Sequence, residues 1–139
     1  MEHITYGTLQ MGEEILRTLA EQTRLRLVRL LLASGESCVC ELIDALQLPQ
    51  YAVSRHLSAL KRAGIVTERR DGSWRHYSVN FKPNSFLGKL LSLIETGLNE
   101  ESLEGDLARF RQRLALRVDG KCIVGIVNKC SCSNTNCSC

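Results

Sequence analysis

Apolar residues recur at helical spacing along most of the chain, and the repeat is interrupted once near its middle. The pattern predicts helices over 9–20, 22–34, 38–47, 50–63, about 85–98 and about 102–117. Ser37 is expected to cap the third helix, and Leu48-Pro49 should separate it from the fourth. In the first helix the expected buried residues are Leu9, Ile15, Leu16 and Leu19.

The interruption predicts a β-hairpin. Two extended runs, 65–70 and 74–80, are joined by Asp71-Gly72-Ser73, and Asp-Gly between extended runs is typical of a tight hairpin turn. Two short helices followed by a hairpin form a winged helix-turn-helix pattern. The predicted fold is therefore mainly α with a small β-hairpin. The last two helices carry more apolar residues than a small core needs, which predicts a homodimer through terminal helices.

Charge supports a nucleic-acid-binding surface. The net charge is only +3, but residues 51–82 hold seven basic and two acidic side chains, whereas 99–106 hold four acidic and no basic ones. A local basic surface suits a polyanion, although a solvated basic surface is the alternative. The outward positions of the 50–63 helix and the hairpin are the candidate contacts to double-stranded operator DNA. They are Gln50, Tyr51, Ser54, Arg55, His56, Lys61, Arg69, Arg70 and Arg75.

The seven cysteines are candidate metal ligands. The first residues do not resemble a signal peptide and no apolar run is long enough to span a bilayer, so we expect a cytoplasmic protein with reduced thiols and no membrane contact. Cys38 and Cys40 would point about 200° apart on a regular helix, but a helix start is less constrained and its free N–H groups favour thiolate. The alternative is that both are small core residues.

Two segments, LRTLAEQTRLRLVRLLLAS and VSRHLSALKRAGIVTERRDGSWRHYSV, resemble the ArsR/SmtB family of metal-responsive repressors over roughly residues 10–98. The motif ESCVCEL at 36–42 is similar to the thiolate signature of its arsenic- and cadmium/lead-responsive branches. The resemblance implies a winged-helix homodimer that represses a resistance operon until inducer binds. We expect two parts in the chain, a DNA-binding and dimerisation domain, 1–118, and a cysteine-rich tail, 119–139, because Asp119-Gly120 interrupts the helical pattern.

The chain departs from the family's arsenic pattern at one ligand. That pattern has a third cysteine three residues after the second, where this sequence has Ile43. The family's cadmium/lead pattern adds cysteines from an N-terminal arm, but residues 1–37 contain no cysteine. We therefore expect further thiolates from the tail, whose cysteines are Cys130, Cys132, Cys137 and Cys139. Cys122 is either a ligand or a packed residue. Three sulfurs would suit As(III) or Sb(III) and four would suit Cd(II) or Zn(II), with Pb(II) a further candidate inducer.

Other functions receive less support. No phosphate loop, carboxylate pair or nucleophile motif is present, so the chain is not expected to be an enzyme or to hold a permanent cofactor. Residues 84–118 lack histidine, so the family's zinc site on the last helices is not expected. Two alternatives remain, a repressor of the same fold switched by thiol oxidation and a metal scavenger that acts through the tail.

Overall fold

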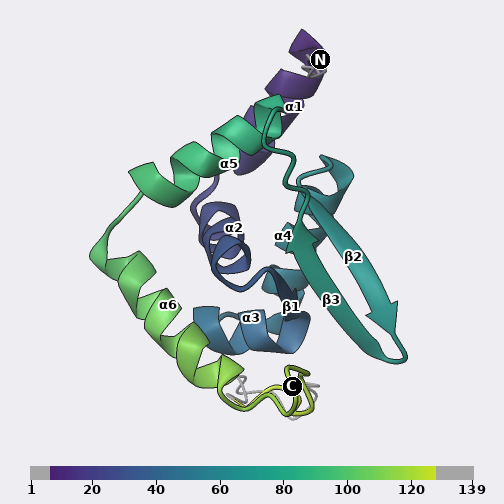
Figure 1. Ribbon diagram of the computed structural model, residues 1–139, viewed down its shortest axis with the longest axis vertical. Coiled ribbons are helices and arrows are strands. Elements are labelled where there is room, and N and C mark those ends of the chain that lie inside the picture. The colour runs from purple at the N-terminus through teal and green to yellow at the C-terminus, as the bar shows by residue number, and fades with distance from the viewer. Residues whose placement is uncertain (1–6, 128–139) are drawn as a thin grey trace.

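The computed structural model describes residues 7–127 and places helices around a small sheet (Figure 1). The predicted helices are all present within one to three residues of their expected bounds. In chain order the elements are α1 (Leu9–Leu19), α2 (Gln22–Ser34), β1 (Glu36–Cys38), α3 (Val39–Leu46), α4 (Gln50–Arg62), β2 (Val66–Asp71), β3 (Trp74–Val79), α5 (Phe86–Gly97) and α6 (Glu101–Leu114).

The sheet contains the predicted hairpin and one strand that the pattern did not predict. Its strand order is β1-β3-β2, with both pairings antiparallel. Asp71 pairs with Trp74, which leaves a two-residue loop that begins with Gly72 at φ 62°. Glycine takes this left-handed conformation without steric cost, so the loop has the glycine position of a type II′ turn. The hairpin extends away from the helical body (Figure 1).

The prediction that Ser37 caps α3 is wrong by one residue. Ser37 is fully buried in β1, opposite Tyr77 of β3, and its hydroxyl lies 2.8 Å from that of Ser34. Cys38 takes the N-cap position in an extended conformation, φ −72° and ψ 148°. Strand pairing thus carries the chain one residue further before the helix begins.

The core lies between α2 and the elements around it, with α2 at the centre (Figure 1). Helix α6 packs against α2 and α3 through one apolar face. The Asp106 carboxylate, 1% exposed, also accepts hydrogen bonds from Arg26 of α2 at 2.7 and 2.8 Å. Helix α6 is therefore fixed to its own chain. The largest fully buried apolar side chains are Phe110, Leu27, Leu30, Leu31, Leu42, Ile43, Leu57, Leu60, Ile65 and Leu91.

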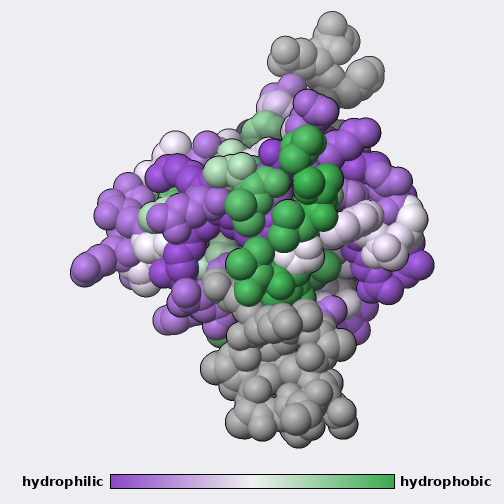
Figure 2. Space-filling view, turned by 90° about the horizontal axis from the view of Figure 1, so that it is seen from below, coloured by the Kyte–Doolittle hydropathy of each residue, from purple (hydrophilic) through white to green (hydrophobic). Residues whose placement is uncertain are grey.

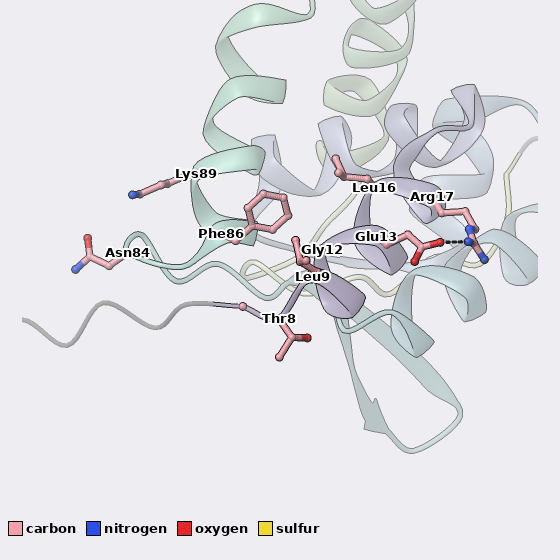
Figure 3. A pocket seen from close by; sticks show the side chains of 10 residues that line it. Thr8, Leu9, Gly12, Glu13, Leu16, Arg17, Asn84, Phe86 and Lys89 are labelled. Carbon is pink, nitrogen blue, oxygen red and sulfur yellow. Dashed lines mark hydrogen bonds and ion pairs between the residues drawn. The ribbon is translucent and has the colours of Figure 1, made fainter.

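Helices α1 and α5 leave an apolar face uncovered. The prediction that Leu9 and Leu16 are buried is wrong for the single chain, because these side chains are 95% and 50% exposed. They line a hollow between α1 and the start of α5 (Figure 3), where the ring of Phe86 would touch a Cβ added at Gly12 at 3.8 Å. Leu93, farther along α5, is 66% exposed. The helical stripe was identified correctly, but residues 7–127 do not cover it.

The segment after α6 carries the last described residues. Val118 and Lys121 form an isolated bridge, and residues 122–127 have no regular secondary structure. Viewed from below, the molecule shows apolar side chains gathered beside the grey residues (Figure 2). The exposed apolar residues of this segment and the turn before it are Leu116, Val118, Ile123 and Val127. Among residues 7–127, no helix combines the length and the apolar character that a membrane crossing requires.

Candidate functional site

Three cysteine sulfurs meet at the start of α3. The Sγ of Cys40 lies 3.0 Å from that of Cys38 and 3.4 Å from that of Cys122, and all three lie within 4.8 Å of one another. Cys38 and Cys40 are 1% and 5% exposed, while Cys122 is half-buried. The structure thus brings together the two predicted ligands and the cysteine whose role the sequence left open.

The N-cap position explains how Cys38 and Cys40 can face the same point. On a regular helix two residues at i and i+2 point in widely different directions. Cys38 precedes the first helical residue and has extended backbone, so its side chain is free of that constraint. The expected geometry at a helix start is therefore present, one residue later than the sequence predicted.

The three thiols have unequal pKa values. The Cys40 thiol donates a hydrogen bond to the Cys38 sulfur, and this bond lowers the pKa of Cys38 to about 6 against the opposing effect of burial. The same bond, together with burial, raises the pKa of Cys40. Burial raises the pKa of Cys122. The cluster therefore holds one thiolate near neutral pH, with two thiols beside it.

A buried ion pair fixes the end of α6 to α3 beside the sulfurs. The Nε of Arg113 lies 2.6 Å from the Oδ2 of Asp44, with the two side chains 4% and 3% exposed. The Nη2 of Arg113 lies 3.6 Å from the Cys40 sulfur and 4.0 Å from that of Cys122. It also donates to the backbone carbonyls of Val124 and Gly125.

A second ion pair fixes the first turn of α3. Glu41 is fully buried and accepts the backbone N–H of Cys38 at 2.9 Å, as the third residue of a capping box does. Arg117 donates to both oxygens of this carboxylate, at 2.7 and 2.8 Å, and to the carbonyl of Glu36 at 2.8 Å. The N-cap cysteine is thus held by a carboxylate that is itself held by Arg117, just after the end of α6.

The tail cysteines Cys130, Cys132, Cys137 and Cys139 lie outside the described residues, so their predicted role as ligands stays a prediction.

The predicted DNA-contacting residues of α4 divide into two groups. Gln50, Arg55 and Lys61 are exposed, as is Tyr51 at 73%, while Ser54 is half-buried. His56 points back toward α2. Its side chain is 13% exposed, and its Nδ1 accepts a hydrogen bond from Arg24 at 3.2 Å. The inward face of α4 consists of Val53, Leu57 and Leu60.

The arginines of the wing are exposed, and two of them form ion pairs. Arg69 donates to Glu36 at 2.8 and 3.1 Å, and Arg70 donates to Glu68 at 3.3 Å. Arg75 is exposed on β3. Because Glu36 begins β1, the Arg69 pair also joins the two edge strands across the sheet.

Sequence reasoning missed Arg113, Arg117, Asp44 and Glu41 as parts of the site. A signal was present in the last helix, where Leu103, Phe110 and Arg113 follow one another at intervals of seven and three and occupy the same buried face. A charged residue on an apolar helical face indicates a buried partner. The exposed Arg62 at the end of α4 was also left out of the predicted DNA contacts.

Comparison with known proteins agrees with this architecture. Residues 14–68 match the family model described as "Bacterial regulatory protein, arsR family". The chain is 37% identical over 98 residues to the arsenic resistance transcriptional regulator ArsR1 of Pseudomonas putida, covering 70% of this chain and 76% of that one. It is 44% identical over 70 residues to an uncharacterized HTH-type transcriptional regulator of Methanocaldococcus jannaschii, covering 50% and 79%.

Solved structures give the same result for the fold. HlyU from Vibrio cholerae superposes with a TM-score of 0.55 at 28% identity, covering 61% of this chain and 88% of that one. These relatives are transcriptional regulators and not enzymes, which confirms the expectation from the sequence. The winged helix-turn-helix, the basic helix α4 and the matches to arsenic resistance regulators lead to one conclusion: the chain belongs to the ArsR family of DNA-binding transcriptional repressors.

Proposed function

We propose that this chain represses an arsenical resistance operon and releases its operator when As(III) or Sb(III) binds to the thiolates of Cys38, Cys40 and Cys122. The meeting of three sulfurs, with Cys40 at 3.0 and 3.4 Å from its neighbours, is the observation that carries this proposal. Soft thiolates favour soft ions, and three of them match the valence of a trivalent metalloid. The regulator would act in the cytoplasm, where its operator DNA lies.

The charges around the cluster favour a trivalent ion over a divalent one. Arg113 is balanced by Asp44 and Arg117 by Glu41, so these four side chains contribute no net charge. Three thiolates and a trivalent ion form a neutral complex, whereas a divalent ion leaves one negative charge. Since burying an uncompensated charge is unfavourable, the neutral complex fits this site better. Cd(II), Pb(II) and Zn(II) are therefore proposed as weaker inducers.

Two routes connect the sulfurs to the DNA-contacting elements. Cys38 pairs with His76 in the sheet, so a displacement of Cys38 acts on the wing. Cys40 lies in the first turn of α3, which packs against α4. An ion bonded to all three sulfurs would impose its own bond lengths and angles on them and so shift the two elements relative to one another. Such a shift would misalign their contacts in the groove.

Operator binding requires the exposed basic surface of α4 and the wing. We propose that Gln50, Tyr51, Ser54, Arg55 and Lys61 contact the major groove, and that Arg69, Arg70 and Arg75 contact the backbone or minor groove. His56 is proposed to act indirectly, because its hydrogen bond to Arg24 orients it along α2.

The second subunit is proposed to bind the uncovered face of α1 and α5. Leu9, Leu16 and Phe86 line an exposed apolar hollow there, Leu93 is exposed farther along α5, and exposed apolar surface of this kind marks an interface. Helix α6 is already packed on its own chain, so of the terminal helices it is α5, with α1, that would pair across a two-fold axis. Leu93→Glu is expected to shift the chain toward monomer in analytical ultracentrifugation, whereas Glu95→Gln on the same helix should not.

Fluorescence anisotropy of a labelled operator, selected from a random DNA library, tests the function. We expect arsenite and antimonite to release the DNA at lower concentrations than cadmium, lead or zinc. Cys38→Ser, Cys40→Ser and Cys122→Ser should each bind the operator normally and respond poorly to arsenite. A chain truncated after Lys129 serves as the matched control for the tail. Unchanged operator affinity with arsenite bound would refute the proposal.

The truncated chain also tests the four tail cysteines as ligands. If they complete the site, truncation weakens the arsenite response as strongly as Cys122→Ser does. If they scavenge ions independently, truncation lowers the number of ions bound per chain and leaves DNA release unchanged.

One contact favours a redox switch as the second candidate. The sulfurs of Cys40 and Cys122 lie 3.4 Å apart on separate segments, so they are better placed to form a disulfide than Cys38 and Cys40, whose bond would close a strained ring. A peroxide would oxidise the two thiols to a disulfide and be reduced to water. DNA release by peroxide in place of arsenite, lost in Cys122→Ser, would favour this candidate.

A further inference from the structure

Arg113 of α6 connects α3, the cysteine cluster and the segment that carries Cys122. Its guanidinium contacts Asp44 of α3, two sulfurs of the cluster and two carbonyl groups of the segment that carries Cys122. The Asp44 carboxylate in turn accepts the backbone N–H of Val127 at 3.0 and 3.1 Å. Both partners of the ion pair therefore hold the segment 122–127, Arg113 through two carbonyl groups and Asp44 through one N–H group.

Apart from this ion pair, the segment 122–127 is held mainly by Ile126, which packs against the core. No regular secondary structure is assigned to residues 122–127, and Ile123 and Val127 are about half exposed. Figure 1 places it beyond the end of α6 and next to α3. A chain without a hydrogen-bonded ladder has considerable conformational freedom, which the arginine fork restricts by binding two successive carbonyls.

Stability alone does not account for this arginine. Its Nη1 is buried and has no hydrogen-bond partner among residues 7–127. A buried ion pair contributes little net stability because desolvation offsets its attraction, and an unpartnered buried nitrogen adds to that cost. The contacts that Arg113 does make converge on the backbone next to Cys122.

We propose that Arg113 is the positioning residue that brings the Cys122 sulfur to the Cys38–Cys40 pair and thereby sets the number of sulfur ligands at three. This inference rests on the proposed function, in which the three thiolates bind a trivalent metalloid. Without Arg113 the Val124 and Gly125 carbonyl groups next to Cys122 lose their hydrogen bonds, while Asp44 of α3 still holds Val127 farther along the segment. The ion is then left with the sulfurs of Cys38 and Cys40.

Arsenic X-ray absorption and arsenite titration of the purified full chain test the proposal. In the unaltered chain we expect three sulfur neighbours around arsenic. In Arg113→Met we expect two, with affinity for arsenite reduced about 10- to 100-fold, as is typical when an outer residue that orients a ligand is removed. Operator binding without arsenite should be preserved and serves as the test of folding. If the single variant fails to fold, Asp44→Asn with Arg113→Met removes both charges together and is expected to show the same two sulfurs.

Arg109→Gln is the matched control. Arg109 lies one turn earlier on α6 and donates to the Ala45 carbonyl of α3 at 2.8 Å, but its hydrogen bonds do not reach the segment 122–127. It should retain three sulfurs and the original affinity. A second control adds Arg113→Met to Cys122→Ser, where Arg113→Met should cause no further loss because it acts through Cys122.

The outcomes separate the two proposals. If the unaltered chain does not bind arsenite through sulfur, the proposed function fails. If the unaltered chain shows three sulfurs and Arg113→Met shows three as well, the function stands and the positioning role is wrong. A loss in Arg113→Met that persists equally in the Cys122→Ser chain would assign Arg113 a direct effect on Cys40 and would also overturn the positioning role.

Discussion

Glu41→Gln tests whether the carboxylate under the N-cap cysteine fixes the start of α3. The Glu41 side chain is fully buried and accepts hydrogen bonds from Arg117 and from the Cys38 backbone. Glutamine keeps the size and one acceptor oxygen but removes the charge, so the Arg117 guanidinium loses its counter-ion.

The structure sets the expected magnitude. Loss of one partner of a fully buried ion pair costs roughly 3–5 kcal/mol. The Arg117 side chain is 21% exposed, so water can hydrate part of the released charge, and we expect a loss of about 2–3 kcal/mol in the free energy of unfolding. For a chain of this length that corresponds to a decrease of roughly 10 °C in Tm.

Urea unfolding followed by circular dichroism, at one fixed protein concentration, measures the effect. Glu13→Gln is the control, because Glu13 is 65% exposed and pairs with Arg17 on the surface of α1, where the loss should be under about 0.5 kcal/mol. Combining Glu41→Gln with Arg117→Met should recover part of the stability, since no uncompensated charge remains. A loss in Glu41→Gln no larger than that in Glu13→Gln would refute this account of the α3 start.

Three further predictions concern the thiols, the packing of α5 and the DNA surface. Thiolate absorbance should show one group titrating near pH 6, ionised above that pH and protonated below it, and Cys38→Ser should abolish this step; absence of any thiolate below pH 7 would contradict the cluster geometry. Gly88→Ala should lose roughly 1–3 kcal/mol in urea unfolding, because its Cβ would overlap the backbone carbonyl oxygen of Lys82, whereas Gly97→Ala has open space and should be neutral or stabilising. Arg55→Ala should weaken operator binding about tenfold and lower its salt dependence in anisotropy titrations, while Arg111→Ala on α6 should leave both unchanged; equal effects would displace the DNA surface from α4.

The helices and the hairpin were predictable because each has a strong local signal. Helix α4 shows apolar residues at fixed helical spacing between a proline and a glycine, and Gly64 adopts φ 76° where the helix was expected to end. The hairpin has its Asp-Gly pair at the turn. Signals of this kind depend only on neighbouring residues, so they predict these elements without knowledge of the rest of the fold.

Strand β1 and its consequence for the cap could not be predicted in this way. Three residues are too few to show an alternating pattern, and β1 forms only because β3 offers a free edge. Ser37 is a good capping residue by type, but pairing with Tyr77 places it inside the sheet. Here a tertiary contact overrides the local preference and transfers the cap to Cys38.

The third sulfur depended on contacts between distant parts of the chain. Cys122 follows Cys40 by 82 positions, and nothing in its neighbourhood distinguishes a ligand from a packed thiol. The docking of α6 on α3 brings it to the site, through the buried Arg113, which the apolar pattern did not identify. Leu9 and Leu16 illustrate the same limit, because their stripe was evident but its partner surface was not.

The long separation between Cys40 and Cys122 has a thermodynamic consequence. An ion bonded to both would act as a staple that closes most of the domain into a loop, and such a cross-link disfavours the unfolded chain by restricting its conformations. The inducer would then make the polypeptide harder to unfold while making it useless as a repressor. The stability of the folded chain would rise while its binding to the operator falls. The cell would therefore retain a folded regulator for as long as the inducer is present.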